Sequence, residues 1–155
     1  MGRLTTHILD TASGGPAAGV PIELFALSGE QRTRIGAAST NADGRCDGPL
    51  LEGESFQVGV YELLFHVGQY LRGRGEELPS PAFLDLVPIC LGIAGPDELY
   101  RVPLLISPYG YSTFLGTYRN MLEIANADWG SLIFRWRHLL AGISLTATFF
   151  PFFFL

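Results

Sequence analysis

Acid–base, nucleophilic and metal chemistry in proteins depends largely on histidine and cysteine, and this chain has few of either. The 155 residues include three histidines, His7, His66 and His138, and two cysteines, Cys46 and Cys90. None of them has the paired spacing of a metal site, and the chain has no phosphate-binding loop, dinucleotide-binding glycine pattern or nucleophile elbow. We therefore expect no metal and no cofactor, and we expect both cysteines to be buried thiols.

Arginine supplies the fixed positive charge that an anionic ligand needs, and two arginines stand in distinct local patterns. Arg45 follows an Asp-Gly turn, where it is either solvated or paired with Asp43 or Asp47. Arg101 lies in an alternating apolar run, where it either binds an anion or pairs with Glu98. Neither arginine can act as a base, because a guanidinium keeps its proton at any working pH.

Period-two alternation and turn residues predict the strands that position these side chains. The clearest run is YRVPLLISPYGYST, in which a turn at residues 108–110 separates two β-rich halves. Residues 41–44 form a second predicted turn, with Gly44 available for a positive φ. The other predicted elements are strands over residues 5–10, 20–26, 33–39, 58–67 and 82–93 and a short helix over 68–75. Many short strands with one short helix indicate a β-sandwich, and Pro88 indicates an edge or a bulge.

The predicted sandwich is acidic. Residues 1–117 contain seven arginines, no lysine and thirteen acidic residues, which gives a formal charge of −6. We expect no nucleic-acid partner, because nucleic acid needs a basic face. Two cysteines are too few for a disulfide framework, and the first ten residues contain no apolar run typical of a secretion signal. These features favour a cytoplasmic location for the sandwich.

The composition changes after the predicted sandwich domain at residues 1–117. Residues 118–130 favour a linker with a short helix, and residues 131–155 favour an apolar segment that anchors the chain in a membrane. The last 17 residues, from Leu139 to Leu155, are uncharged. As a helix they span about 25 Å, slightly less than a hydrocarbon core of about 30 Å.

Residues before this uncharged run can compensate for its short length. Arg135 and Arg137 can extend their charges toward the headgroups, with Trp136 at the depth of the membrane interface. The positive charges then keep the sandwich on the cytoplasmic side of a single-pass C-terminal anchor. The alternatives are an additional core or subunit-interface helix, and disordered sequence.

Three blocks of the sequence, LTTHILDTASGGPAAGVP, TNADGRC and VPLLISPYGYST, resemble the transthyretin and 5-hydroxyisourate hydrolase family. The resemblance covers roughly residues 4–113 and implies a transthyretin-like antiparallel β-sandwich with one short helix. It also implies an enzyme that opens the ring of 5-hydroxyisourate, a product of urate oxidation. Attack of water on a ring carbonyl needs a general base and a cation that stabilises charge on the oxygen.

The family's active site lies at a channel between subunits and uses two histidines, an arginine and a tyrosine-arginine-glycine-serine tail. By position, the resemblance places the first histidine on His7 and the arginine on Arg45. The second histidine falls on Arg101, and the tail reads FLGT from Phe114 to Thr117. Because arginine cannot accept a proton, we expect an incomplete catalytic set, and we favour evolutionary drift at an abandoned site as the explanation of Arg101. Without the resemblance, a single histidine beside a strand is more often a packed or surface residue.

These departures favour an accessory or stabilising subunit of a membrane protein complex, of respiratory or photosynthetic type. Its expected partners are integral-membrane subunits and lipid, contacted through residues 131–155, and the family homotetramer is not expected. One alternative is an active 5-hydroxyisourate hydrolase for this purine-derived small molecule, with His7 as the base and Arg45 with Arg101 binding the anion. A second alternative is a small-ligand carrier that uses the channel between subunits, as transthyretin does.

Overall fold

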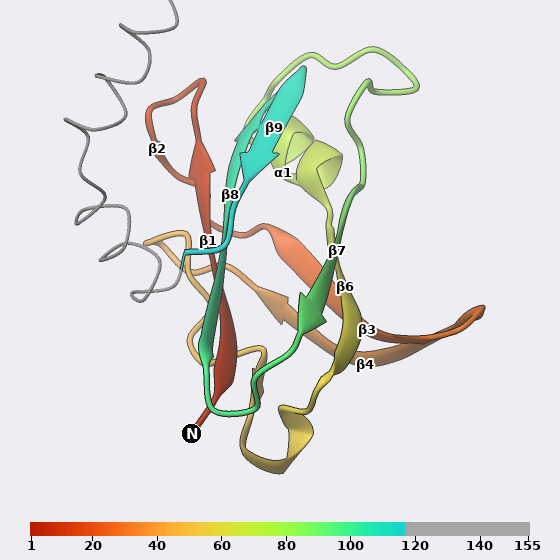
Figure 1. Ribbon diagram of the computed structural model, residues 1–155. Coiled ribbons are helices and arrows are strands. Elements are labelled where there is room, and N and C mark those ends of the chain that lie inside the picture. The colour runs from red at the N-terminus through yellow and green to blue at the C-terminus, as the bar shows by residue number, and fades with distance from the viewer. Residues whose placement is uncertain (117–155) are drawn as a thin grey trace, which may run out of the picture. The chain divides into compact units, whose positions relative to one another are not determined.

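The computed structural model describes residues 1–116, which form two β-sheets packed around one hydrophobic core (Figure 1). One sheet has the strand order β2-β1-β8-β9, with β5 also paired to β1, and the other has the order β4-β3-β6-β7. The strands are β1 Arg3–Asp10, β2 Gly15–Pro16, β3 Pro21–Ser28, β4 Gln31–Ser39, β5 Leu51–Glu52, β6 Gly59–Phe65, β7 Val87–Ile93, β8 Leu99–Ser107 and β9 Gly110–Thr113. The helices are the short 3-10 helix η1 Gly53–Ser55 and the α-helix α1 Val67–Gly73. The prediction of a mainly β sandwich with one short α-helix is confirmed.

Alternation along the strands decides which side chains form the core. The even-numbered residues of β1 and β8 are buried, and the odd-numbered residues between them are exposed or partly exposed. The fully buried large side chains of the two sheets and α1 include Leu4, Ile8, Leu104 and Ile106 from one sheet, Ile22, Leu24, Leu63 and Phe65 from the other, and Leu71 from α1. Burial of each such side chain stabilises the fold by about 1.5–3 kcal/mol.

The pairing of β1 with β8 is parallel, whereas the other strand pairs within the described residues are antiparallel. The buried hydroxyl of Thr6 donates a hydrogen bond to the Val102 carbonyl at 2.7 Å across this pair. The register places Arg3 opposite Leu99, Thr5 opposite Arg101 and His7 opposite Pro103. The outward-facing residues of β1 and β8 therefore share one surface.

Several predicted strand boundaries differ from the structure, and two of these differences have a clear cause. The strand predicted over residues 58–67 ends at Phe65, because Val67 already begins helix α1. The strand predicted over residues 82–93 begins only at Val87. Pro88 lies in β7, an edge strand of its sheet, as its lack of a donor N–H predicts.

The segment before β7 packs on α1 instead of extending the sheet. The Gly68 N–H donates a hydrogen bond to the Asp85 carbonyl at 2.9 Å, and the Arg72 guanidinium pairs with the Asp85 carboxylate at 2.7 Å. A Cβ at Gly68 would overlap the Asp85 side chain, so only glycine permits this close approach. These contacts explain why the β-rich residues before Val87 are not part of the strand.

The predictions for the C-terminal part lie outside the described residues. They include the linker over residues 118–130, the anchoring segment over 131–155 and the interfacial residues Arg135, Trp136 and Arg137. The uncharged run from Leu139 to Leu155 also lies outside them. Within residues 1–116, no helix is long and apolar enough to cross a membrane.

A buried carboxylate connects α1 to the first strand. Asp10, the last residue of β1, is 3% exposed. Its side chain accepts hydrogen bonds from the Tyr70 hydroxyl at 3.0 Å, the Ala12 and Ser13 amides at 2.9 and 3.2 Å, and Arg74 at 3.3 Å. Burial by itself raises the pKa of Asp10, but the hydrogen bonds from Ser13, Tyr70 and Ala12 outweigh it and hold the pKa below 3.8. The charged form of Asp10 therefore stabilises the fold.

The substitution Asp10→Asn is expected to lower the free energy of unfolding by about 1–3 kcal/mol, because an amide cannot accept all of these hydrogen bonds. The pKa of Asp10 is lower in the folded state than in the unfolded state. Its contribution to the free energy of unfolding is therefore complete above pH 3.8, and it is lost as the pH falls through the folded-state pKa. Urea titrations at neutral and acidic pH measure this difference, with the exposed Asp97→Asn as the control. A difference between wild type and Asp10→Asn that stayed constant at low pH would contradict the prediction.

Candidate functional site

Three segments that are far apart in the sequence meet on the outward face of β1. Arg3, Thr5 and His7 alternate along this face, and Arg101 of β8 lies beside Thr5. On the other side of β1, residues 45–49 line a pocket. The chain then continues into β5, which pairs with the beginning of β1. The site therefore depends on β1 and its two neighbours.

A tight turn fixes the backbone of residues 41–45. Gly44 has φ +71°, and its carbonyl accepts a hydrogen bond from the Ile8 N–H at 2.8 Å. A Cβ at Gly44 would overlap the Ile8 carbonyl oxygen, so both conformation and space require glycine. The side-chain oxygen of Asn41 accepts a hydrogen bond from the Arg45 N–H at 3.2 Å. The predicted turn, with glycine in the left-handed region, is confirmed.

His7 is partly buried next to Arg45. The two residues form an isolated antiparallel β-bridge. Burial lowers the pKa of the His7 imidazole below 6.5, and the positive charge of Arg45 lowers it further. A hydrogen bond with the Asp43 backbone and the charge of Asp43 oppose this shift without cancelling it. The imidazole is therefore mainly neutral at pH 7 and available to accept a proton.

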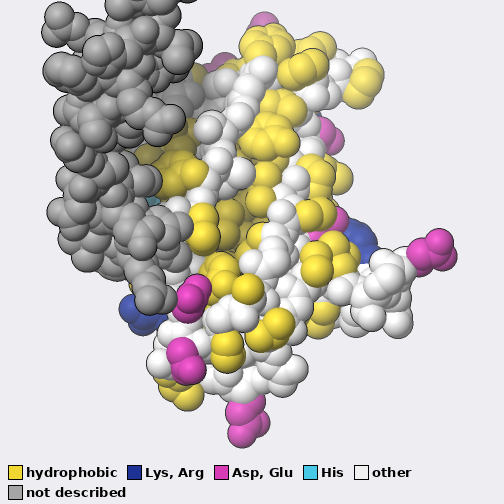
Figure 2. Space-filling model, in the orientation of Figure 1, with side chains coloured by type: hydrophobic (Ala, Val, Ile, Leu, Met, Phe, Trp, Pro, Cys, Tyr) yellow, Lys and Arg dark blue, Asp and Glu magenta, His cyan; other side chains and the backbone are white. Residues whose placement is uncertain are grey.

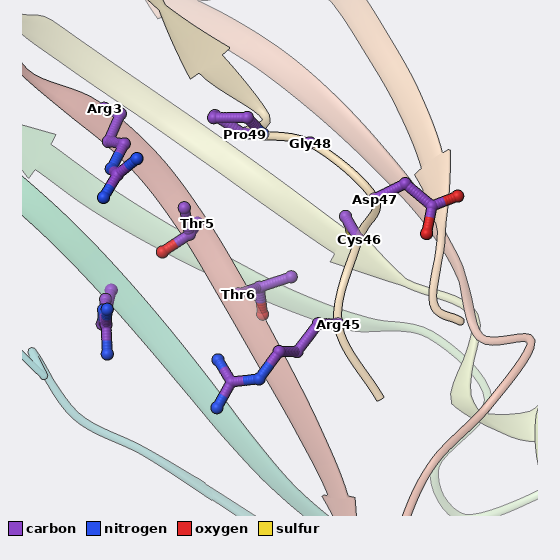
Figure 3. A pocket seen from close by; sticks show the side chains of 9 residues that line it. Arg3, Thr5, Thr6, Arg45, Cys46, Asp47, Gly48 and Pro49 are labelled. Atoms are coloured by element: carbon purple, nitrogen blue, oxygen red, sulfur yellow. The ribbon is translucent and has the colours of Figure 1, made fainter. Parts of the chain in front are cut away.

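Positive charge is concentrated beside His7. Among the seven arginines of residues 1–116, four form the ion pairs Arg32–Glu62, Arg34–Glu23, Arg72–Asp85 and Arg74–Asp10. Three further arginines, Arg3, Arg45 and Arg101, all line one pocket of about 230 Å³, which we call the arginine pocket (Figure 3). The other lining residues are Thr5, Thr6, Cys46, Asp47, Gly48 and Pro49.

The arrangement of charges in the arginine pocket favours an anionic ligand. Figure 3 shows Arg3 toward one end and Arg45 toward the other, with Thr5 between them. The carboxylate of Asp47 points away from both guanidinium groups and accepts a hydrogen bond from the Asn41 side chain at 2.9 Å. Because guanidinium groups bind planar anions through paired N–H donors, the pocket suits a flat, negatively charged molecule.

The other candidate reactive groups add little to this site. Burial raises the pKa of the Cys46 thiol, and the charge of Asp47 raises it further, so the thiol stays protonated. Cys90, predicted to be buried, is exposed because its side chain lies on the outward face of edge strand β7. His66 lies away from this site, and its ring nitrogen contacts the Glu23 carboxylate on β3 at 3.1 Å. Within residues 1–116, no three histidine, cysteine or acidic side chains are grouped to hold a metal ion.

A second cavity has a different character. It is a groove of about 260 Å³ lined by Ile89, Leu91, Gly92, Tyr100, Val102, Thr113, Phe114 and Leu115. Figure 2 shows apolar side chains gathered on this face of the sandwich. The Tyr100 hydroxyl, its one titratable group, accepts a hydrogen bond from the Ala94 N–H at 2.9 Å. This groove therefore lacks the charged side chains that line the arginine pocket.

The structure brings together some of the predicted site residues and adds others. Arg45 and Arg101 line the arginine pocket, and His7 adjoins it through its bridge to Arg45. Arg3 and Thr5 were not predicted as site residues. Their spacing contained the signal, because residues two and four positions before His7 lie on the same face of a strand.

Comparisons with known proteins agree with the fold. The model of the HIUase/Transthyretin family matches residues 4–116. The 5-hydroxyisourate hydrolase 2 of Rhizobium meliloti is 59% identical over 116 residues, which are 75% of this chain and 97% of the relative. The solved structure of Klebsiella pneumoniae 5-hydroxyisourate hydrolase has a TM-score of 0.63 and 30% identity, covering 76% of this chain and 100% of its own. Sea bream transthyretin, solved in complex with thyroxine, has a TM-score of 0.66 and 26% identity, covering 74% of this chain and 95% of its own.

These similarities show that the expectation of an accessory subunit of a membrane complex is wrong, whereas the predicted membrane anchor lies outside the matched residues. Four relatives with 53–60% identity are all named 5-hydroxyisourate hydrolase. The expectation gave too much weight to the apolar C-terminal run and to the arginine at position 101. Arg101 lines the same pocket as Arg45 and therefore adds to the positive charge of this face.

The turn that positions Arg45 can be tested with two glycine substitutions. Gly44→Ala is expected to destabilise the protein by about 1–3 kcal/mol and to shift the NMR signals of the His7 imidazole, because strain and crowding displace residues 44 and 45. Gly14→Ala is the matched control, since Gly14 has φ +73° but open space where a Cβ would lie. Urea titrations measure the free energy of unfolding of both variants, and NMR spectra record the His7 signals. Equal destabilisation, with unchanged His7 signals, would contradict a positioning role for Gly44.

Proposed function

We propose that this chain, which belongs to the HIUase/Transthyretin family, is an active 5-hydroxyisourate hydrolase. The observation that carries the proposal is the backbone β-bridge that holds His7 against Arg45, beside a pocket lined by three arginines. The lowered pKa of the His7 imidazole agrees with it. This arrangement supplies a proton acceptor and fixed positive charge next to each other. Hydrolysis of a cyclic amide in an anionic, purine-derived molecule requires both.

The reaction begins when His7 accepts a proton from water as the water oxygen bonds to the ring carbonyl carbon. Negative charge then develops on the carbonyl oxygen, and the guanidinium of Arg45 stabilises it. When the tetrahedral carbon collapses, the bond to the ring nitrogen breaks and the imidazolium of His7 donates its proton to that nitrogen. The ring is opened, and the attacked carbon becomes a carboxylic acid that ionises at neutral pH.

Arg101 occupies the position at which the family resemblance places a second histidine. A guanidinium does not exchange its proton at working pH, so Arg101 binds negative charge and transfers no proton. Both proton transfers then fall to His7, first as base and afterwards as acid. The chain is thus proposed to use one titrating group where the family pattern has two.

Hydrolysis by the purified full-length chain is the first test of this proposal. The chain is expected to accelerate the decay of freshly generated 5-hydroxyisourate, followed by its ultraviolet absorbance. His7→Ala is expected to slow the decay by about a hundred- to ten-thousandfold, because it removes the general base. His66→Ala is the control and leaves the rate unchanged. Decay no faster than in buffer would overturn the proposed function, and full activity of His7→Ala would overturn the role of His7.

The pH dependence of kcat/KM tests the electrostatics of His7. Because the reactive form is the neutral imidazole and its pKa is lowered below 6.5, kcat/KM is expected to fall with a single-proton slope as the pH falls through the shifted pKa, and to level off well above it. Arg45→Gln removes a charge that lowers this pKa, so it is expected to move the midpoint to higher pH and to reduce the rate. If the pH profile of kcat/KM for the wild-type protein had its midpoint above pH 6.5, His7 would not be the titrating base.

A further inference from the structure

Arg3 lines the arginine pocket but has no part in the mechanism above. We infer that Arg3 is a specificity-determining residue, which binds the negatively charged edge of the substrate at the end of the pocket away from His7. The inference rests on the proposed function for the identity of the substrate. The ligand class that it defines is broader, namely planar heterocyclic anions whose charge lies away from the carbonyl that is attacked.

The backbone of Arg3 is held firmly although it lies near the start of the chain. Its N–H donates a hydrogen bond to the Glu98 carbonyl at 3.2 Å, and its Cα is paired with both Glu52 and Leu99. The preceding residue, Gly2, is buried so closely that a Cβ there would overlap the Phe56 ring. The Arg3 side chain therefore starts from a fixed point at the edge of the pocket.

The position of Arg3 separates it from the reacting bond. Arg3 and His7 lie four residues apart on β1, which corresponds to about 13 Å along the strand. Arg101 lies between them beside Thr5, and Arg45 lies at the His7 end. A molecule that reaches from His7 along the pocket thus meets Arg45 first and Arg3 last.

The charge of Arg3 is available to a ligand. Within residues 1–116, Arg3 belongs to none of the ion pairs. Its strand partner Glu52 forms no ion pair with it either. The carboxylate of Asp47, which lines the same pocket, is directed away from it toward Asn41. In a chain whose formal charge is −5, a cation kept apart from the surrounding acids attracts anions to this one face.

This geometry predicts an effect on binding and little effect on the chemical step. An interaction far from the attacked carbonyl is equally strong in the bound substrate and in the transition state, so it changes KM and leaves kcat nearly constant. A residue that stabilised the developing oxyanion would instead change kcat. The ratio of these two effects therefore separates Arg3 from the residues around His7.

The experiment compares Arg3→Gln with Arg34→Gln in the full-length chain. Both substitutions remove one positive charge from an exposed arginine, but Arg34 lies on β4 of the other sheet. Arg3→Gln is expected to raise KM for 5-hydroxyisourate by about ten- to hundredfold, with kcat changed less than about twofold. It is also expected to flatten the rise of KM with added sodium chloride, because a screened charge has been removed. Arg34→Gln should change neither quantity.

Binding of urate, measured by calorimetry, gives a readout that does not require turnover. Urate is a planar purine anion, and its dissociation constant is expected to rise in Arg3→Gln and to stay unchanged in Arg34→Gln. If the wild-type chain binds urate in this way but hydrolyses nothing, the proposed function fails and the role of Arg3 stands. If the chain hydrolyses its substrate and Arg3→Gln lowers kcat at constant KM, or changes neither KM nor urate binding, the inference about Arg3 is overturned.

Discussion

The parallel pairing of β1 with β8 is the constraint on which the site depends. It joins residues 3–10 to residues 99–106, and its register decides which outward-facing side chains become neighbours. Arg101 lies beside Thr5, and not beside His7, only because of this register. A shift of one residue would turn the odd-numbered side chains of β8 into the core and remove Arg101 from the pocket. The buried contacts of Leu4, Ile8 and Leu104 oppose such a shift, so the packing of the core also fixes the charges on the surface.

A second constraint acts from the other side of β1. The turn at residues 41–45 is held by Gly44 and Asn41, and it places the backbone of Arg45 against His7. The imidazole thus loses part of its hydration and faces a permanent cation, and both effects favour its neutral form. The charge that is proposed to stabilise the oxyanion also keeps the base deprotonated. One local arrangement therefore serves two steps of the proposed reaction.

The sequence predicted much of the fold because its patterns are local. Alternating residues identified the long strands, and the Asn41–Gly44 turn followed from turn chemistry. The beginning of β7 was missed because Asp85 is held against Gly68 and Arg72 of α1, a tertiary contact that overrides β propensity. The grouping of Arg3 with Arg101 was missed for a similar reason, since a parallel register between strands almost a hundred residues apart has no local signal. The weight given to the uncharged C-terminal run led the functional prediction away from the enzyme.

The central claim is that a neutral His7 and the arginine pocket form one electrostatic unit. Titration of the His7 imidazole by NMR in the full-length protein, without and with saturating urate, tests this claim most directly. We expect a pKa below 6.5 in the free protein and a higher pKa with urate, because a bound anion offsets the positive charge of the arginines. A pKa at or above 6.5 in the free protein, or a value that urate leaves unchanged, would contradict it.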